Sequence, residues 1–99
     1  MTRLLRITPR AQADLERLFE FLADQDVAAA QRARAAIEKA YGFIEAFPFA
    51  CRKVDSGNPF LREAVISFGS AGYVALFEVE DEDTVNILAF RHQREGDYY

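Results

Sequence analysis

Short apolar runs in the second half of the chain predict a three-stranded meander. The runs Leu61–Phe68, Tyr73–Val79 and Val85–Arg91 are rich in Val, Ile, Phe and Tyr. A glycine-containing break, Gly69–Gly72, and an acidic break, Glu80–Asp83, separate them. Such breaks are typical of tight connections between antiparallel strands. The pattern therefore predicts strand, turn, strand, turn and strand.

Both faces of this predicted sheet are largely apolar. Successive side chains of a strand point to opposite faces. In the middle run, one face holds Tyr73, Ala75, Phe77 and Val79, and the other face holds Val74 and Leu76. In the last run, one face holds Val85, Ile87 and Ala89, and the other face holds Leu88 and Phe90. A sheet that is wetted on one side alternates apolar with polar residues, so both faces of this sheet require cover.

The first half of the chain predicts a strand and a helical hairpin. Leu4–Thr8 is a short β-type run, after which Thr8 can cap a helix and Pro9 suits its first position. Apolar residues then recur at helical spacing as far as Ala23–Gln25. Asp26 can cap a second helix, which Pro48 ends at Phe47.

These elements predict an α+β fold with the order β-α-α-β-β-β, formed by residues 1–99 as a single domain. The helical hairpin packs on one face of a mainly antiparallel sheet. Its buried residues are predicted to be Leu15, Leu18, Phe19, Ile37, Ile44, Leu76 and Phe90. Phe49–Pro59 is predicted to be a loop. The pattern leaves open where the first strand joins the sheet.

The second sheet face has two interpretations. A contiguous apolar patch usually marks a binding surface, and free strand edges can also accept an added strand. Alternatively, the polar tail, Arg91–Tyr99, and the Phe49–Pro59 loop cover this face. The pattern alone does not choose between a partner and these segments of the chain.

The composition favours a cytosolic protein without a metal or other cofactor. We see no signal peptide and no apolar run long enough to span a membrane. Cys51 is the single cysteine and His92 the single histidine, so neither an internal disulfide nor a zinc site is expected.

The net charge of −4 comes largely from one window of acidic residues. That window contains Glu78, Glu80, Asp81, Glu82 and Asp83. Elsewhere twelve basic residues face eleven acidic ones. A nucleic-acid binder usually has an overall basic character, so direct DNA binding by this chain is not expected. The acidic window is predicted to be a solvated turn, with a docking site for a basic partner as the alternative.

Basic residues near the ends of the meander are the candidates for a functional site. Arg62 begins the first strand, and the last strand ends in Arg91 and His92. With Arg94 and Tyr98 or Tyr99 they could bind a phosphate, His92 acting as acid or base. In the structural alternative His92 is hydrogen-bonded and the arginines pair with Glu63, Glu95 or Asp97. No orienting third residue accompanies Cys51 and His92 as a nucleophilic pair.

Several motifs resemble the ParE/RelE superfamily of bacterial toxins over nearly the whole chain. The most specific is the last strand, Val85 to Phe90, running into Arg91-His92-Gln93-Arg94, which looks more like the ParE branch than the RelE branch. The other motifs are Thr8-Pro9 with Ala11 and Asp14-Leu15, Phe47-Pro48, Leu61-Arg62-Glu63, and Val74–Val79 with its acidic turn.

The resemblance implies a toxin that a co-expressed antitoxin neutralises by wrapping it with an extended or helical segment. ParE-branch members typically inhibit DNA gyrase by binding, without a catalytic centre or cofactor. Gyrase is therefore the expected target, and Arg62, Arg91, His92, Arg94 and Tyr98 are the candidate target-binding residues.

The alternative implied by the resemblance is a RelE-like endoribonuclease that cuts mRNA on the ribosome. In that case Arg62, Arg91, His92 and Tyr98 would be catalytic. The chain departs from the nuclease pattern because it has no lysine after Lys53 and is acidic overall. The ParE-like interpretation is therefore preferred.

Overall fold

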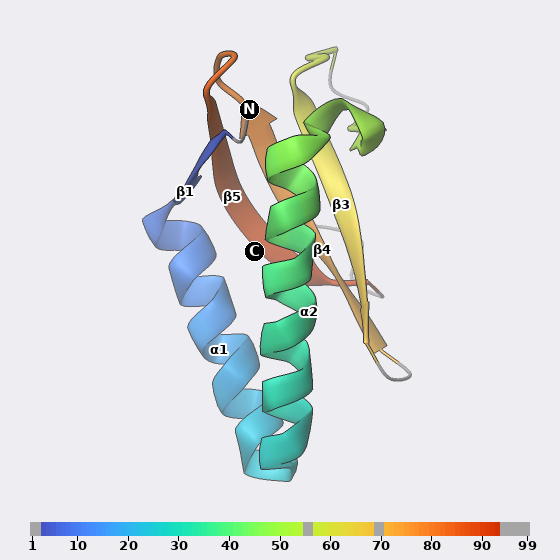
Figure 1. Ribbon diagram of the computed structural model, residues 1–99. Coiled ribbons are helices and arrows are strands. Elements are labelled where there is room, and N and C mark those ends of the chain that lie inside the picture. Colours follow the sequence, from blue (N-terminus) through green and yellow to red (C-terminus); the bar gives the residue numbers. More distant parts are fainter. Residues whose placement is uncertain (1–2, 55–56, 69–70, 94–99) are drawn as a thin grey trace.

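A helical layer covers one face of a sheet (Figure 1). The computed structural model describes residues 3–54, 57–68 and 71–93. In chain order the elements are β1 (Leu4–Ile7), α1 (Pro9–Gln25), α2 (Val27–Ala46), the 3-10 helix η1 (Pro48–Ala50), β2 (Arg52–Lys53), β3 (Leu61–Phe68), β4 (Ala71–Val79) and β5 (Thr84–His92). The predicted α+β class, with a helical hairpin on one face of the sheet, is confirmed.

The strands form one mixed sheet in the order β1-β5-β4-β3-β2. The pairs from β2 to β5 are antiparallel, as predicted for the meander. β1 pairs with β5 in parallel, which the sequence did not reveal. A parallel pair needs a long crossover connection, and α1 and α2 belong to the intervening chain. The sequence predicted Phe49–Pro59 to be a loop, but this segment contains part of η1 and the short strand β2.

Both helices begin where the sequence predicts them. The Thr8 hydroxyl accepts a hydrogen bond from the Ala11 N–H at 3.2 Å, as an N-cap should. Asp26 ends α1 by donating its N–H to the Leu22 carbonyl at 2.8 Å. Its carboxylate also accepts from the Ala28 N–H at 2.9 Å and so caps α2. Within the described residues, neither helix has the length and apolar character needed to cross a membrane.

The core lies between the helices and one sheet face. Of the residues predicted to be buried, five are confirmed: Leu15, Leu18, Ile37, Ile44 and Phe90. Phe19 is only partly buried, and the Arg34 guanidinium lies 4.6 Å from its ring centroid. The placement of Leu76 in this core was wrong. Its neighbours Ala75 and Phe77 face the helices, so strand alternation turns Leu76 to the opposite face.

A β-bulge in β5 changes the predicted alternation. Phe77 of β4 lies opposite Ile87, but the preceding β4 residue lies opposite Ala89, which leaves Leu88 without a partner across the ladder. A bulge of this kind inverts the side-chain alternation beyond it. Phe90 therefore shares the helix-facing side with Ile87, and Ala89 turns to the other face. The sequence-based assignment had these two residues, Ala89 and Phe90, on the wrong faces.

Two polar side chains from the start of the helical hairpin bind the backbone at this bulge. The Thr8 hydroxyl donates to the Leu88 carbonyl at 3.2 Å. The buried Asp14 carboxylate accepts from the Phe90 N–H at 2.9 Å. These backbone groups lie beyond the end of β1, so the side chains replace a missing strand partner. The contacts tie α1 to the final part of β5.

The second sheet face contains both covered and exposed apolar residues. Val74 and Ala89 are buried, whereas Val65 is 45% exposed. Of the polar tail that was considered as a cover for this face, residues 94–99 lie outside the described residues. In the predicted loop, the backbone carbonyls of Phe49 and Cys51 accept hydrogen bonds from the Arg62 guanidinium. Since Arg62 pairs with the core residue Phe77, this part of the loop follows the helix side of the sheet.

Replacing Leu18 by Ala tests the packing of α1. Leu18 is buried against the sheet, so we expect a loss of about 2–5 kcal/mol in the free energy of unfolding. Urea denaturation followed by circular dichroism measures this loss. Glu20→Ala on the exposed side of the same helix is the control, with an expected change within about 0.5 kcal/mol. Equal unfolding midpoints for the two variants would contradict the assigned helix face.

Replacing Asp14 tests the bond between α1 and β5. Asp14→Ala leaves the Phe90 N–H without its acceptor, which we expect to cost about 1–3 kcal/mol of unfolding free energy. Asp14→Asn retains an acceptor oxygen and should lose less. Denaturation midpoints give the order wild type, Asn, Ala. A variant with Ala as stable as the wild type would show that this hydrogen bond does not stabilise the fold.

Candidate functional site

The predicted site residues lie at separate places on the sheet. Arg62 is near the start of β3, whereas His92 ends β5. Their partners on β4, Phe77 and Tyr73, are four residues apart. At the usual rise of a strand this places the two residues about 13 Å apart along the sheet. The further candidates, Arg94, Tyr98 and Tyr99, lie outside the described residues.

Arg62 is a buried cation bound by the backbone. Its Nε donates to the Pro59 carbonyl at 2.9 Å, and its Nη1 donates to the carbonyls of Cys51 at 3.0 Å and Phe49 at 3.3 Å. The guanidinium also lies 5.1 Å from the centroid of the Phe49 ring, a cation–π arrangement. Arg62 therefore fixes the segment between η1 and β3, and these carbonyls engage its Nε and Nη1 donors.

Cys51 has the environment of a structural thiol. Burial raises the pKa of Cys51, although the nearby Arg62 charge acts in the opposite direction. Since the thiolate is the nucleophile, a raised pKa lowers its reactivity at neutral pH. Cys51 directly precedes β2, which forms one edge of the sheet. His92 ends β5, and β3 and β4 lie between these two strands. The structure does not bring the two residues together as a catalytic pair.

Arg91 takes part in an ion-pair network on the second sheet face. Its Nη2 lies 3.6 Å from Glu63 Oε2, and Arg52 Nε lies 3.0 Å from Glu63 Oε1. The side chains of Arg91 and Glu63 are each 12% exposed. The predicted alternative, in which an arginine pairs with Glu63, is confirmed for Arg91. The two arginines thus contact different oxygens of the same carboxylate.

A cleft opens beside the end of β5, between this strand and α1. Its volume is about 300 Å³. Phe21 stands at this cleft and is 58% exposed. The His92 ring packs edge-on to the Tyr73 ring, with centroids 5.2 Å apart. The full lining is Asp14, Arg17, Leu18, Phe21, Tyr73, Phe90, Arg91 and His92. We call this the β5-end cleft.

Asp14 organises the charges of the β5-end cleft. Its carboxylate pairs with Arg17, and the Arg10 Nε lies 3.7 Å from its second oxygen. That second oxygen also accepts from the Phe90 N–H. The Arg17 side chain is 64% exposed. The cleft thus combines an exposed arginine and an exposed aromatic ring with the imidazole of His92.

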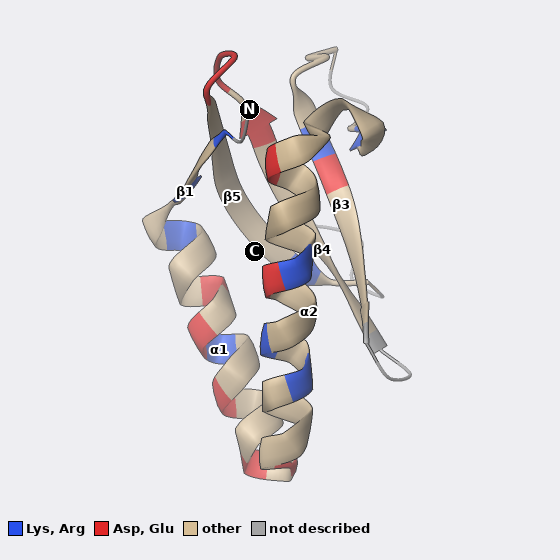
Figure 2. Cartoon of the chain, in the orientation of Figure 1, with Lys and Arg blue, Asp and Glu red and all other residues tan. Residues whose placement is uncertain are grey.

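The acidic window lies at the opposite end of the sheet (Figure 2). Glu80–Asp83 connects β4 to β5 at the start of β5, whereas the cleft lies at its end. Asp81 accepts the Asp83 N–H at 2.8 Å, which is local turn bonding. Carboxylates of the turn therefore do not neutralise the cations of the β5-end cleft.

Sequence reasoning missed the helix side of this cleft. Asp14 follows Ala11 by three positions and precedes Leu18 by four, so the helical stripe already placed a carboxylate among buried apolar residues. Phe21 follows Leu18 by three positions and Asp14 by seven, so the same spacing places an aromatic side chain on this side of the helix. Nothing in the sequence pattern indicates that α1 ends up beside His92, because β1 sets that position through its parallel pairing.

The comparisons with known proteins agree with this fold. The fold is similar to a solved chain of the chromosomal ParDE TA system from P. aeruginosa, with 18% sequence identity and a TM-score of 0.69. The similarity covers 92% of this chain and 96% of that chain, and at this identity it concerns the fold. A search of the curated proteins gave no significant match.

The sequence itself matches a family model over nearly its full length. The model describes the ParE toxin of type II toxin-antitoxin systems, parDE, and matches residues 5–96. The predicted resemblance to the ParE branch is thereby confirmed. The chain belongs to the ParE toxin family of type II toxin–antitoxin systems.

Proposed function

We propose that this chain is a toxin that inhibits DNA gyrase by binding to it and that a cognate antitoxin neutralises it. It acts in the cytoplasm, where gyrase is found, and it needs no cofactor. The proposal rests on membership of the ParE family and on the arrangement of the candidate residues. The overall charge of −4 further favours a protein target over direct binding to DNA.

The bonding of Arg62 is the observation that carries this choice over RNA cleavage. A nuclease must hold a polyanion and stabilise the charge that develops on a phosphate. The RelE-like alternative needs Arg62 for that purpose together with His92. The Arg62 guanidinium is instead engaged by three backbone carbonyls. Arg62 also lies toward the opposite end of the sheet from His92, because their partners on β4 are Phe77 and Tyr73.

The β5-end cleft is the proposed gyrase-binding surface. Arg17 and Phe21 are exposed there, and Arg91 and His92 line the same cleft. Arginine and aromatic side chains supply much of the binding energy at protein interfaces. Arg94 and Tyr98 follow directly in the sequence, so the proposal includes them in this surface, whereas Arg62 contributes indirectly by holding the loop before β3.

Gyrase supercoiling tests this proposal in vitro. The purified chain should inhibit supercoiling of relaxed plasmid, and addition of the antitoxin should restore it. Phe21→Ala should raise the inhibitor concentration needed by about tenfold, since it removes an exposed aromatic anchor worth about 1–2 kcal/mol. Phe60→Ala is the matched control, because Phe60 is similarly exposed but lies at the start of β3, near the acidic turn.

A variant of His92 distinguishes binding from RNA cleavage. His92→Ala should weaken inhibition only by the loss of its contacts, whereas a nuclease would lose its proton carrier and its activity. The proposal fails if the wild-type chain leaves supercoiling unaffected while transcripts are cut in the presence of ribosomes. Equal effects of Phe21→Ala and Phe60→Ala would place the binding surface elsewhere on the molecule.

A further inference from the structure

Two exposed phenylalanines stand close together at one end of the molecule. Phe49 of η1 is 48% exposed, and Phe60, which directly precedes β3, is 50% exposed. Their ring centroids lie 6.2 Å apart in an edge-to-face arrangement. The C-terminal end of α2 and the β4–β5 turn lie at the same end (Figure 1). An exposed aromatic patch of this kind is typical of an interaction site.

The two rings form part of a pocket beside the acidic β4–β5 turn. Its volume is about 360 Å³. The described lining residues are Arg3, Phe49, Phe60, Val79, Glu80, Asp81 and Glu82. None of these residues lines the β5-end cleft. We call this second site the aromatic–acidic pocket.

Carboxylates dominate the polar part of the aromatic–acidic pocket. Glu80, Asp81 and Glu82 line it, and Arg3 is the only cation among its described lining residues. The Arg3 Nη1 donates to the Glu45 carbonyl at 3.2 Å. Because this carbonyl belongs to the last turn of α2, the negative end of the helix dipole compensates part of the Arg3 charge. The pocket therefore carries an excess of negative charge.

Two of these carboxylates are available to a ligand. Glu80 already has a partner, since the Arg6 Nη1 lies 3.7 Å from its Oε2. Asp81 accepts only the backbone N–H of Asp83. Within the part of the chain that the structure describes, neither Asp81 nor Glu82 forms an ion pair. Charge complementarity favours a cationic ligand at this position.

The aromatic part of the pocket already holds one guanidinium. The chain's own Arg62 lies 5.1 Å from the centroid of the Phe49 ring. Among the described residues, no cation lies over the neighbouring Phe60 ring. A guanidinium is attracted to the face of an aromatic ring, and arginine makes this contact more often than lysine. Phe60 therefore offers a second position of the same kind, beside free carboxylates.

Backbone hydrogen bonds fix Phe60 before any ligand binds. Its N–H donates to Asn58 Oδ1 at 2.9 Å. Its carbonyl accepts from the Val79 N–H, also at 2.9 Å. A binding site whose walls are already ordered loses little conformational entropy when it is occupied. This supports a preformed site rather than a loosely placed surface ring.

We propose that the aromatic–acidic pocket binds an arginine side chain from a basic segment of a partner protein. The apolar stem of that side chain packs on Phe60 and Val79, as long cationic side chains do on apolar surfaces. Its guanidinium lies against the Phe60 ring and donates to the carboxylates of Asp81 and Glu82. This surface is separate from the proposed gyrase-binding cleft, and the proposal does not depend on the identity of the toxin's target.

A second copy of this chain is a less favourable occupant. Two copies that meet at this pocket around a two-fold axis would bring their acidic turns together. Like charges that face one another across an interface are unfavourable. A basic partner brings the opposite charge to the same carboxylates. The pocket therefore fits a basic segment better than an identical surface.

An NMR titration of the isotope-labelled full chain with a defined peptide tests the proposal. The probe is a short peptide, blocked at both ends, that carries arginines between leucines. The reference peptide has glutamine in place of arginine. The arginine peptide should bind about tenfold more tightly or better, and it should shift the amide signals of Phe60 and Glu82 most strongly.

Variants of Phe60 separate the contribution of the ring from that of general attraction. Phe60→Ala should weaken binding of the arginine peptide by about fivefold to tenfold, because it removes the ring on which the guanidinium lies. Phe60→Tyr keeps an aromatic face and should bind within about twofold of wild type. Circular dichroism verifies that both variants are folded.

A charge-matched pair of variants tests the carboxylates. Glu82→Gln should weaken binding by about threefold, as expected for one exposed ion pair. Asp24→Asn removes the same charge from an exposed residue near the end of α1. This control should bind within about twofold of wild type.

Three results would overturn the proposal. Equal affinities for the two peptides would show that the pocket does not select arginine. Equal losses from Glu82→Gln and Asp24→Asn would reduce the binding to attraction by the overall charge. Self-association of the free chain in sedimentation that Phe60→Ala abolishes would assign the pocket to a second copy. Phe60→Ala is expected to retain gyrase inhibition, so failure here leaves the proposed function intact, and failure of gyrase inhibition leaves this pocket intact.

Discussion

The hydrogen bond from the Phe90 N–H to the Asp14 carboxylate is the contact on which the arrangement of helix and strand depends. The bulge at Leu88 breaks the regular pattern of β5 where β1 has already ended. A buried N–H without an acceptor costs about 1–3 kcal/mol, and Asp14 supplies the acceptor at 2.9 Å. With the Thr8 bond to Leu88, it holds α1 against β5. Phe21 consequently lies beside the strand end.

Local chemistry made much of the fold predictable, and long-range contacts account for what was missed. The Thr8 and Asp26 caps depend on neighbours in the sequence, so the helix boundaries follow from the residues themselves. The bulge and the parallel pairing of β1 depend on distant segments, and alternation alone misplaced Ala89 and Phe90. The sequence suggested Arg62 as a ligand-binding residue. Its three carbonyl partners lie in the segment from η1 to β3, whose sequence has no periodicity that would reveal these contacts.

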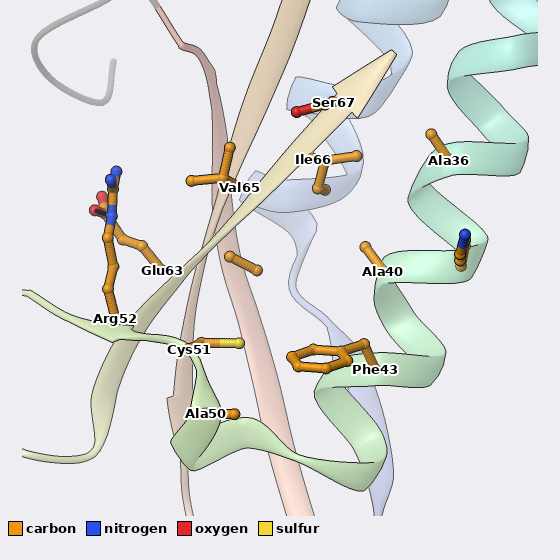
Figure 3. Close-up of a pocket in the computed structure, with 12 residues that line it drawn as sticks. Ala36, Ala40, Phe43, Ala50, Cys51, Arg52, Glu63, Val65, Ile66 and Ser67 are labelled. Carbon is orange, nitrogen blue, oxygen red and sulfur yellow. Dashed lines mark hydrogen bonds and ion pairs between the residues drawn. The ribbon is translucent and has the colours of Figure 1, made fainter.

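The sheet separates the functional regions that the sequence grouped together. Arg62 and the acidic turn lie toward one end, while Arg91 and His92 lie at the other. A cavity of about 450 Å³ between α2 and β3, lined in part by Ala36, Ala40 and Phe43, is a third region (Figure 3). A protein that acts by binding can use several separate surfaces, whereas phosphate chemistry needs its groups close enough to act on one phosphate. This distribution supports the proposed action by binding over phosphate chemistry.

The order in which cellular processes stop is the most direct test of action by binding gyrase. Cells that induce the chain without its antitoxin are pulse-labelled for DNA synthesis and for protein synthesis at short intervals. The account predicts that DNA synthesis falls first, with induction of the DNA-damage response, while translation continues. An earlier fall in protein synthesis, accompanied by transcripts cleaved within codons, would contradict it.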